Sequence, residues 1–217
     1  MILSPLYAIL DVDIAASHGW TVPDLARACC DGGARLLQVR AKTLGSGAFL
    51  ALADEVVGVG RAYGADVIVN DRADLARISG AAGVHVGQED LDPAAARHVV
   101  GSSAIVGRST HTLTQIASAR REPISYLAVG PVFGTASKDT GYQAVGLALV
   151  SEAARSGTAS SEGGGEALPI VAIGGITLER AASVIAAGAA SVAVIAELLV
   201  GDDPARRVRD YLDRLGA

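Results

Sequence analysis

Eight short runs rich in β-branched and other apolar residues alternate with alanine-rich stretches along the chain of 217 residues. The runs that we expect to form strands are residues 5–10, 35–40, 66–70, 83–87, 104–108, 125–130, 169–173 and 191–195. The stretches with a helical pattern are residues 22–31, 47–63, 71–79, 92–99, 112–121, 143–156, 177–187 and 203–215. Strands that alternate with helices indicate a parallel sheet, and eight such units favour its closure into a (β/α)₈ barrel. A doubly wound open sheet is the alternative.

The domain organisation follows from the same pattern. We expect residues 1–217 to form one single-domain α/β TIM barrel, a size that is normal for this fold. The segment "SGTASSEGGGEA", residues 156–167, is rich in Gly, Ser and Glu and has almost nothing to bury. Because it follows the sixth helix, it is predicted to be a flexible surface loop on the face opposite the one where barrel active sites form.

Composition excludes several classes of protein. A formal net charge of −5 argues against general nucleic-acid binding, which usually needs a basic face. The start "MILSPLYAILDVD" is typical of a first strand rather than a signal peptide, and the apolar run 181–196 is too short to span a membrane. Cys29 and Cys30 are adjacent and predict neither a disulfide framework nor a metal site, which fits a reducing cytoplasm. The sequence predicts a cytoplasmic protein with no membrane or nucleic-acid partner and leaves a homo-oligomer open.

Cations follow the second expected strand in "LLQVRAKTLG". Because side chains alternate along a strand, Gln38, Arg40 and Lys42 point the same way. With Lys138 from the sixth strand's loop, they could face an anionic substrate, since opposite unit charges 4 Å apart attract by about 4 kcal/mol at an effective dielectric of about 20. The alternative is a structural ion pair between these cations and a barrel acid such as Asp11.

Two carboxylates, Asp71 and Asp90, follow the third and fourth expected strands. Hard oxygen ligands on one rim suit Mg²⁺, which binds through one or two carboxylates together with substrate phosphate oxygens. The alternative is that each aspartate caps the helix that follows it.

A glycine pair in "IVAIGGI", Gly174 and Gly175, lies between the seventh strand and a helix. Backbone N–H groups at such turns bind phosphate, and this is the usual phosphate site of the barrel fold. The alternative is a tight turn with no ligand.

The histidines and serines show no pattern of nucleophilic catalysis. We expect His85 to be a barrel residue, His98 an exposed helix residue, and His18 and His111 loop or cap residues. A dinucleotide-binding fingerprint is also missing, so neither a dinucleotide cofactor nor nucleophilic hydrolysis is predicted.

Six ordered motifs carry a resemblance that covers nearly the whole chain. They are "QVRAK", "VIVNDRADLA", "GVHVGQEDL", "VGRSTHT", "GPVFGTASK" and "VAIGGI". Together they strongly resemble the thiamine phosphate synthase family. The resemblance implies a (β/α)₈ barrel transferase that joins a hydroxymethylpyrimidine diphosphate to a thiazole phosphate, releases pyrophosphate and uses one Mg²⁺ per active site.

The resemblance also implies the roles of individual residues. Arg40, Lys42 and Lys138 are implied to be catalytic, and Asp71 and Asp90 to hold the metal. The residues implied to bind the pyrimidine diphosphate are Gln38, Val39, Arg40, Ala41, Lys42, Asn70, Ser109 and Lys138. The residues implied to bind the thiazole phosphate are Thr135, Ala136, Ser137, Gly175, Ile195 and Ala196.

Small departures and two rival functions remain. Ala196 stands where many relatives have serine, so one phosphate contact is expected to be made by backbone alone, and Ser137 stands where threonine is common. The related thiazole tautomerase branch has a histidine at the position of Pro131 and lacks the paired acids, so this chain is more similar to the synthases. A non-catalytic phosphate-binding barrel is the second rival, and it would need neither Asp71 nor Asp90.

Overall fold

Eight parallel strands close into a barrel in the computed structural model, which describes residues 3–134, 141–159 and 168–216. Each strand pairs with its neighbour in sequence, and β8 pairs with β1. The strands are β1 Leu6–Asp11, β2 Leu36–Arg40, β3 Asp66–Asn70, β4 Gly83–Val86, β5 Ile105–Thr110, β6 Tyr126–Val129, β7 Ile170–Ile173 and β8 Ser191–Val194. The predicted (β/α)₈ fold is confirmed, and each predicted strand is found within one or two residues of its expected ends.

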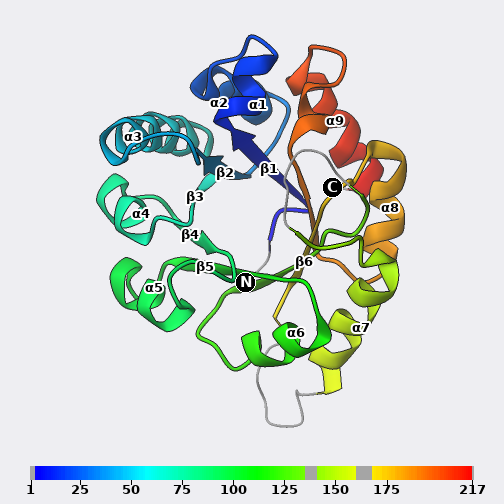
Figure 1. Ribbon diagram of the computed structural model, residues 1–217. Coiled ribbons are helices and arrows are strands. Elements are labelled where there is room, and N and C mark those ends of the chain that lie inside the picture. Colours follow the sequence, from blue (N-terminus) through cyan, green and yellow to red (C-terminus); the bar gives the residue numbers. More distant parts are fainter. Residues whose placement is uncertain (1–2, 135–140, 160–167, 217) are drawn as a thin grey trace.

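The helices form a ring around the strands (Figure 1). They are α1 Val12–Ser17, α2 Val22–Asp31, α3 Ser46–Tyr63, α4 Ala73–Ser79, α5 Pro93–Val100, α6 Leu113–Ala119, α7 Gly146–Ala159, α8 Leu178–Ala186 and α9 Pro204–Leu215, with a short 3₁₀ helix, η2, at Ala196–Leu199. All eight expected helices are present. Residues 156–159, predicted as the start of the surface loop, instead form the end of α7, and residues 160–167 of that loop lie outside the described part of the chain.

Two short helices, α1 and η2, were not expected from the sequence. The α1 helix begins where the Asp11 side chain accepts hydrogen bonds from the backbone N–H groups of Asp13 and Ile14, at 3.1 and 3.0 Å. A helix of six residues is too short to show the repeating spacing of apolar residues that identifies a helix in a sequence. The capping aspartate is therefore the feature of the sequence that indicates α1.

Apolar side chains form two separate layers, one on each side of the strands. Leu37 belongs to the outer layer, which lies between the barrel and the helices. Leu36 belongs to the smaller inner layer, which fills the barrel together with Tyr7, Ile68 and Tyr126. The alternation predicted for β2 is therefore confirmed, and Gln38 lies on the same inward face as Leu36.

Gly107 on β5 makes room inside the barrel for the Tyr126 ring. A Cβ atom at this position would lie 2.0 Å from Tyr126 Cζ and 2.3 Å from its hydroxyl oxygen. The Tyr126 ring is fully buried, and its hydroxyl is hydrogen-bonded on two sides, so it cannot move aside cheaply.

Cys29 and Cys30 are free thiols that lie buried on α2. Burial raises the pKa of both thiols, and that of Cys30 to about 11. Among the described helices, none is both long enough and apolar enough to cross a membrane.

We predict that Gly107→Ala destabilises the protein, because the added methyl group overlaps a ring that has nowhere to go. Overpacking of this kind costs about 1–3 kcal/mol. The matched control is Gly58→Ala on α3, where an added Cβ meets nothing within 4 Å and removing a helical glycine stabilises by up to about 1 kcal/mol. Urea unfolding measures both variants. Equal stability of Gly107→Ala and the parent protein would contradict the packing described here.

We also predict that neither thiol reacts with a disulfide reagent in the folded protein at pH 8. The thiolate is the reacting form, and burial with a raised pKa keeps both groups protonated and covered. The absorbance change of an Ellman assay should appear only after guanidinium is added. Rapid labelling of the folded protein would show that α2 opens easily.

Candidate active site

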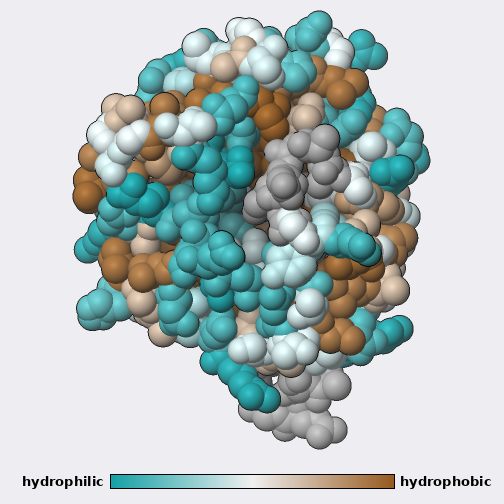
Figure 2. Space-filling view, viewed as in Figure 1, coloured by the Kyte–Doolittle hydropathy of each residue, from teal (hydrophilic) through white to brown (hydrophobic). Residues whose placement is uncertain are grey.

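The carboxyl ends of the strands open onto one face of the barrel, where hydrophilic residues gather around the centre (Figure 2). In a (β/α)₈ barrel this is the face on which active sites form. Three of the sequence-predicted residues, Gln38, Arg40 and Asn70, line one small buried pocket of about 10 Å³ inside the barrel. Gln38 and Asn70 are almost fully buried, with 2% and 5% of their surface exposed.

Arg40 forms an ion pair with Asp11, its register partner on β1. The exposed fractions of the two side chains are 14% and 3%, so the pair is largely shielded from water. The structural ion pair with Asp11, which was the alternative to substrate binding for Arg40, is therefore present. One donor nevertheless remains unused, because the buried Nε of Arg40 has no hydrogen-bond partner in the described structure.

Lys42 lies beside the two predicted metal ligands. Its Nζ is 2.5 Å from Asp71 Oδ2, while half of its own side chain is exposed. The Asp71 and Asp90 carboxyl groups lie within hydrogen-bonding distance of each other. Burial of the Asp71 carboxyl and the neighbouring Asp90 both raise the pKa of Asp71, and the Lys42 ammonium opposes this rise.

Neither aspartate caps a helix, which was the alternative to a metal site. Arg72 is at the N-cap of α4 and makes no side-chain cap, and Asp92 caps α5 by accepting from the Ala94 N–H at 2.8 Å. Asp90 instead accepts a hydrogen bond from the Gly87 N–H at 2.8 Å. Asp71 has a φ angle of 63°, a left-handed conformation that is uncommon outside glycine and that is often found at functional sites.

Two further residues of the predicted diphosphate set contribute no side chain on this face. Val39 and Ala41 belong to the outer apolar layer, between the strands and the helices. Only their backbone groups can contact a ligand at the barrel mouth. Lys138, Thr135, Ala136 and Ser137 lie outside the described residues.

A chain of hydrogen bonds crosses the barrel interior and ends at two predicted site residues. Gln38 Nε2 donates to the Tyr7 hydroxyl at 2.7 Å, and that hydroxyl is 3.1 Å from the hydroxyl of Tyr126. His85 Nδ1 is 2.8 Å from the Tyr126 hydroxyl, and its Nε2 is 2.8 Å from Ser109 Oγ. From the sequence, His85 was predicted only as a barrel residue, and the two tyrosines were missed.

The order of donors along this chain follows from its first bond. Because Tyr7 accepts from Gln38, its own proton is directed to Tyr126, whose proton is then directed to His85 Nδ1. When Tyr126 donates to Nδ1, the neutral His85 ring carries its proton on Nε2, where it can donate to Ser109 Oγ. Burial raises the pKa of both tyrosines, so they stay protonated as this order requires. The Ser109 hydroxyl is thereby left to donate its own proton to a ligand.

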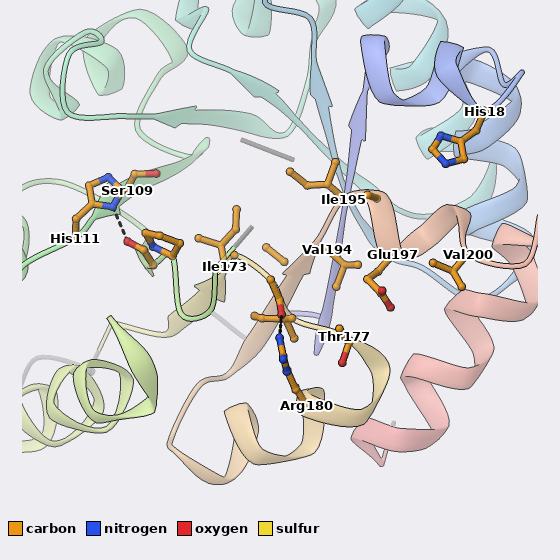
Figure 3. Close-up of a pocket in the computed structure, with 18 residues that line it drawn as sticks. His18, Ser109, His111, Ile173, Thr177, Arg180, Val194, Ile195, Glu197 and Val200 are labelled. Carbon is orange, nitrogen blue, oxygen red and sulfur yellow. Dashed lines mark hydrogen bonds between the residues drawn. The ribbon is translucent and has the colours of Figure 1, made fainter. Parts of the chain in front are cut away.

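A larger cavity of about 380 Å³ lies at the ends of β5 to β8 (Figure 3). Gly175, Ile195, Ala196 and Ser109 from the predicted set all line it. Figure 3 shows Ser109 and His111 at one end of this cavity and His18 and Val200 at the other. Ser109, which was predicted for the pyrimidine diphosphate, therefore lies between this cavity and the hydrogen-bond chain that begins at Gln38.

The turn after β7 needs glycine. Gly174 and Gly175 have φ angles of 100° and 62°, and a Cβ on Gly175 would lie 2.5 Å from the Gly134 carbonyl oxygen. Side chains are therefore excluded, and the backbone of the turn is left open to the cavity. Such a backbone is suited to bind an anion.

Several cavity residues were not predicted to be functional. His18 and His111 were expected to be loop or cap residues, and Arg180 and Glu197 were not singled out. His111 Nδ1 contacts the Gly130 carbonyl at 2.5 Å, and its ring stacks on Tyr142. In the described part of the chain, no three His, Cys, Asp or Glu side chains cluster as a metal site, so the two aspartates would need ligands from elsewhere.

Comparison with known proteins gives consistent results. The family described as thiamine monophosphate synthase matches residues 6–198. The thiamine-phosphate synthase of Koribacter versatilis is 44% identical over 98% of this chain and 96% of its own length. A "thiamine biosynthesis bifunctional protein" of Symbiobacterium thermophilum is 42% identical over 99% of this chain, which spans only 42% of that longer protein.

A solved structure supports the fold. The thiamine phosphate pyrophosphorylase from Pyrococcus furiosus superposes with a TM-score of 0.84 over 98% of this chain and 96% of its own, at 24% identity. Since the family match covers most of the barrel and the curated relatives align along its whole length, the chain belongs to the thiamine monophosphate synthase family, as its motifs predicted.

Proposed function

We propose that the chain is a thiamine-phosphate synthase, a transferase that joins a hydroxymethylpyrimidine diphosphate to a thiazole phosphate and releases pyrophosphate. The observation that carries the proposal is the division of the barrel mouth into two adjoining parts. Charged and amide side chains occupy the ends of β1 to β4, and a glycine-edged, largely apolar cavity occupies the ends of β5 to β8. A polar diphosphate and a flat thiazole ring with one phosphate need two such environments.

The pyrimidine diphosphate is assigned to the first part. Gln38 and Asn70 present amide groups on the inward face, where they can pair with the ring nitrogens and the amino group of a pyrimidine. Arg40, Lys42 and Lys138 would attract the diphosphate. Because Asp11 already compensates much of the Arg40 charge, Lys42 and Lys138 are expected to contribute more of the net attraction.

Asp71 and Asp90 are proposed to hold one Mg²⁺. What supports this is their chemistry: two carboxyl groups lie close enough to raise the pKa of Asp71, neither caps a helix, and a divalent cation would relieve their repulsion. When bound, Mg²⁺ would neutralise charge that develops on the departing diphosphate. Asp71 forms an ion pair with Lys42, so a metal held by Asp71 would leave Lys42 available to the substrate.

The thiazole phosphate is assigned to the cavity at the ends of β5 to β8. Its phosphate would bind the open backbone at Gly175, Ile195 and Ala196, joined by Thr135, Ala136 and Ser137. The apolar side chains of Ile173 and Pro131 would flank its ring.

The reaction requires positioning rather than a protein nucleophile. The bond between the pyrimidine's methylene carbon and the diphosphate oxygen breaks, and the electron pair leaves with pyrophosphate. The aminopyrimidine spreads the resulting positive charge, and the thiazole nitrogen then forms the new carbon–nitrogen bond. The cations stabilise the leaving group electrostatically, and Gln38 and Ser109, fixed by the buried hydrogen-bond chain, hold the pyrimidine in line with the thiazole.

The proposed function is tested by mixing the purified chain with the two substrates and MgCl₂ and measuring thiamine phosphate by chromatography. Product should form with Mg²⁺ and should be lost when EDTA is added. Accumulation of an isomerised thiazole phosphate without coupling would instead favour the tautomerase branch. Binding of thiazole phosphate without any conversion would favour a non-catalytic barrel.

We predict that Asp71→Asn lowers the turnover number at least about 100-fold, because a group that stabilises charge in the transition state is removed. The fold should be kept, since asparagine tolerates the left-handed backbone that Asp71 adopts. The matched control is Asp74→Asn in the first turn of α4, which breaks an exposed pair with Arg72 and should leave turnover unchanged. Similar turnover numbers for the two variants would contradict the assignment of Asp71 as a metal ligand.

A further inference from the structure

Arg180 is a cation that reaches the larger cavity from α8. Its Nη1 donates to the Gly175 carbonyl at 3.1 Å, and its guanidinium carbon lies 4.7 Å from the centre of the Phe133 ring. Figure 3 shows this side chain extending from α8 to the glycine turn. The contact with Phe133 holds the guanidinium plane beside the turn without using its N–H donors.

The Arg180 charge is not compensated by a carboxylate within the described structure. Its recorded partners there are a neutral carbonyl and an aromatic face. The carboxylate that lines the same cavity, Glu197, is already paired with Arg207 and lies 3.4 Å from the Tyr211 hydroxyl. An anion at the glycine turn would therefore meet an available guanidinium and a carboxylate that Arg207 neutralises.

Besides Arg180, the described cavity-lining side chains that can donate a hydrogen bond are those of His18, Ser109, His111 and Thr177. Gly174 and Gly175 have no side chain, and Ile195 and Ala196 have apolar ones. Backbone N–H groups and hydroxyl groups carry no net charge, so they do not by themselves balance a doubly charged phosphate. Among the described lysines and arginines, Arg180 is the one that lines this cavity.

We propose that Arg180 binds the phosphate of the thiazole substrate and exchanges its hydrogen bond with the Gly175 carbonyl for one or two bonds to phosphate oxygens. The inference rests on the proposed function and adds a residue to its thiazole phosphate subsite. An arginine is suited to this exchange because its fork of N–H groups can bind two oxygens at once while its plane stays against Phe133. The pyrimidine subsite, which lies at the ends of β1 to β4, is not affected.

The test compares Arg180→Ala and Arg180→Lys with Arg209→Ala, which removes an exposed arginine of α9 that does not line the cavity. In Arg180→Ala, the KM for thiazole phosphate should rise roughly 10- to 100-fold, as expected for a lost charge-assisted hydrogen bond. The KM for the pyrimidine diphosphate should not change. Arg180→Lys should give an intermediate value, because it keeps the charge and loses the fork, and Arg209→Ala should match the parent chain.

Inorganic phosphate provides a second readout that does not depend on the thiazole ring. It should inhibit the parent chain competitively against thiazole phosphate and should inhibit Arg180→Ala much more weakly. An unchanged KM and unchanged phosphate inhibition in Arg180→Ala would overturn the proposal, while the proposed function would stand. If the parent chain makes no thiamine phosphate, the proposed function fails, and calorimetric titration with thiazole phosphate still decides the role of Arg180 by the same comparison.

Discussion

A continuous set of hydrogen bonds inside the barrel joins side chains from five strands and fixes both its packing and its site. It runs from Gln38 on β2 through Tyr7, Tyr126 and His85 to Ser109 on β5. A buried polar group left without a partner costs about 1–3 kcal/mol, so each member depends on the next one being in place. Gln38 and Ser109, at the two ends of this set, are residues that we assign to substrate binding. Because both are hydrogen-bonded to buried side chains, the core of the barrel determines their orientation.

Charge compensation divides the mouth of the barrel into two regions. At the ends of β1 to β4, Asp11 holds Arg40 and Asp71 holds Lys42, so the positions of both cations are fixed by carboxylates of the protein itself. At the ends of β7 and β8, Glu197 is paired with Arg207, and Arg180 contacts a carbonyl and a ring but no carboxylate among the described residues. The first region suits a diphosphate that brings its own cation, and the second suits a monophosphate that needs one from the protein.

Much of this architecture was predictable because local signals and the global pattern agree. Thr21, Asp92 and Asp203 each stand at the start of an expected helix with a proline close behind, and all three side chains accept a backbone hydrogen bond from the first turn. The alternation of β2 placed Gln38 on the inward face because a buried strand allows only one register.

Pairings between distant residues were not predictable in the same way. That Arg40 pairs with Asp11 depends on the register between β1 and β2, and the sequence left this pair as an alternative to substrate binding. The tyrosines of the buried chain look like ordinary core residues, and only the small size of Gly107 hints that a large ring faces it. Arg180 is an exposed residue of α8, and its contact with the Gly175 carbonyl becomes visible only when the turn is placed beside the helix.

The claim that two substrates occupy two adjoining regions is tested most directly by a crystal structure of the chain with thiamine phosphate, pyrophosphate and Mg²⁺. We expect the pyrimidine ring to lie against Gln38 and Asn70 and the pyrophosphate with its metal at Asp71 and Asp90. We expect the phosphate group of thiamine phosphate at the Gly175 turn. A product bound with its phosphate at Asp71 and Asp90, or bound away from the barrel mouth, would show that the two substrates do not occupy these two regions.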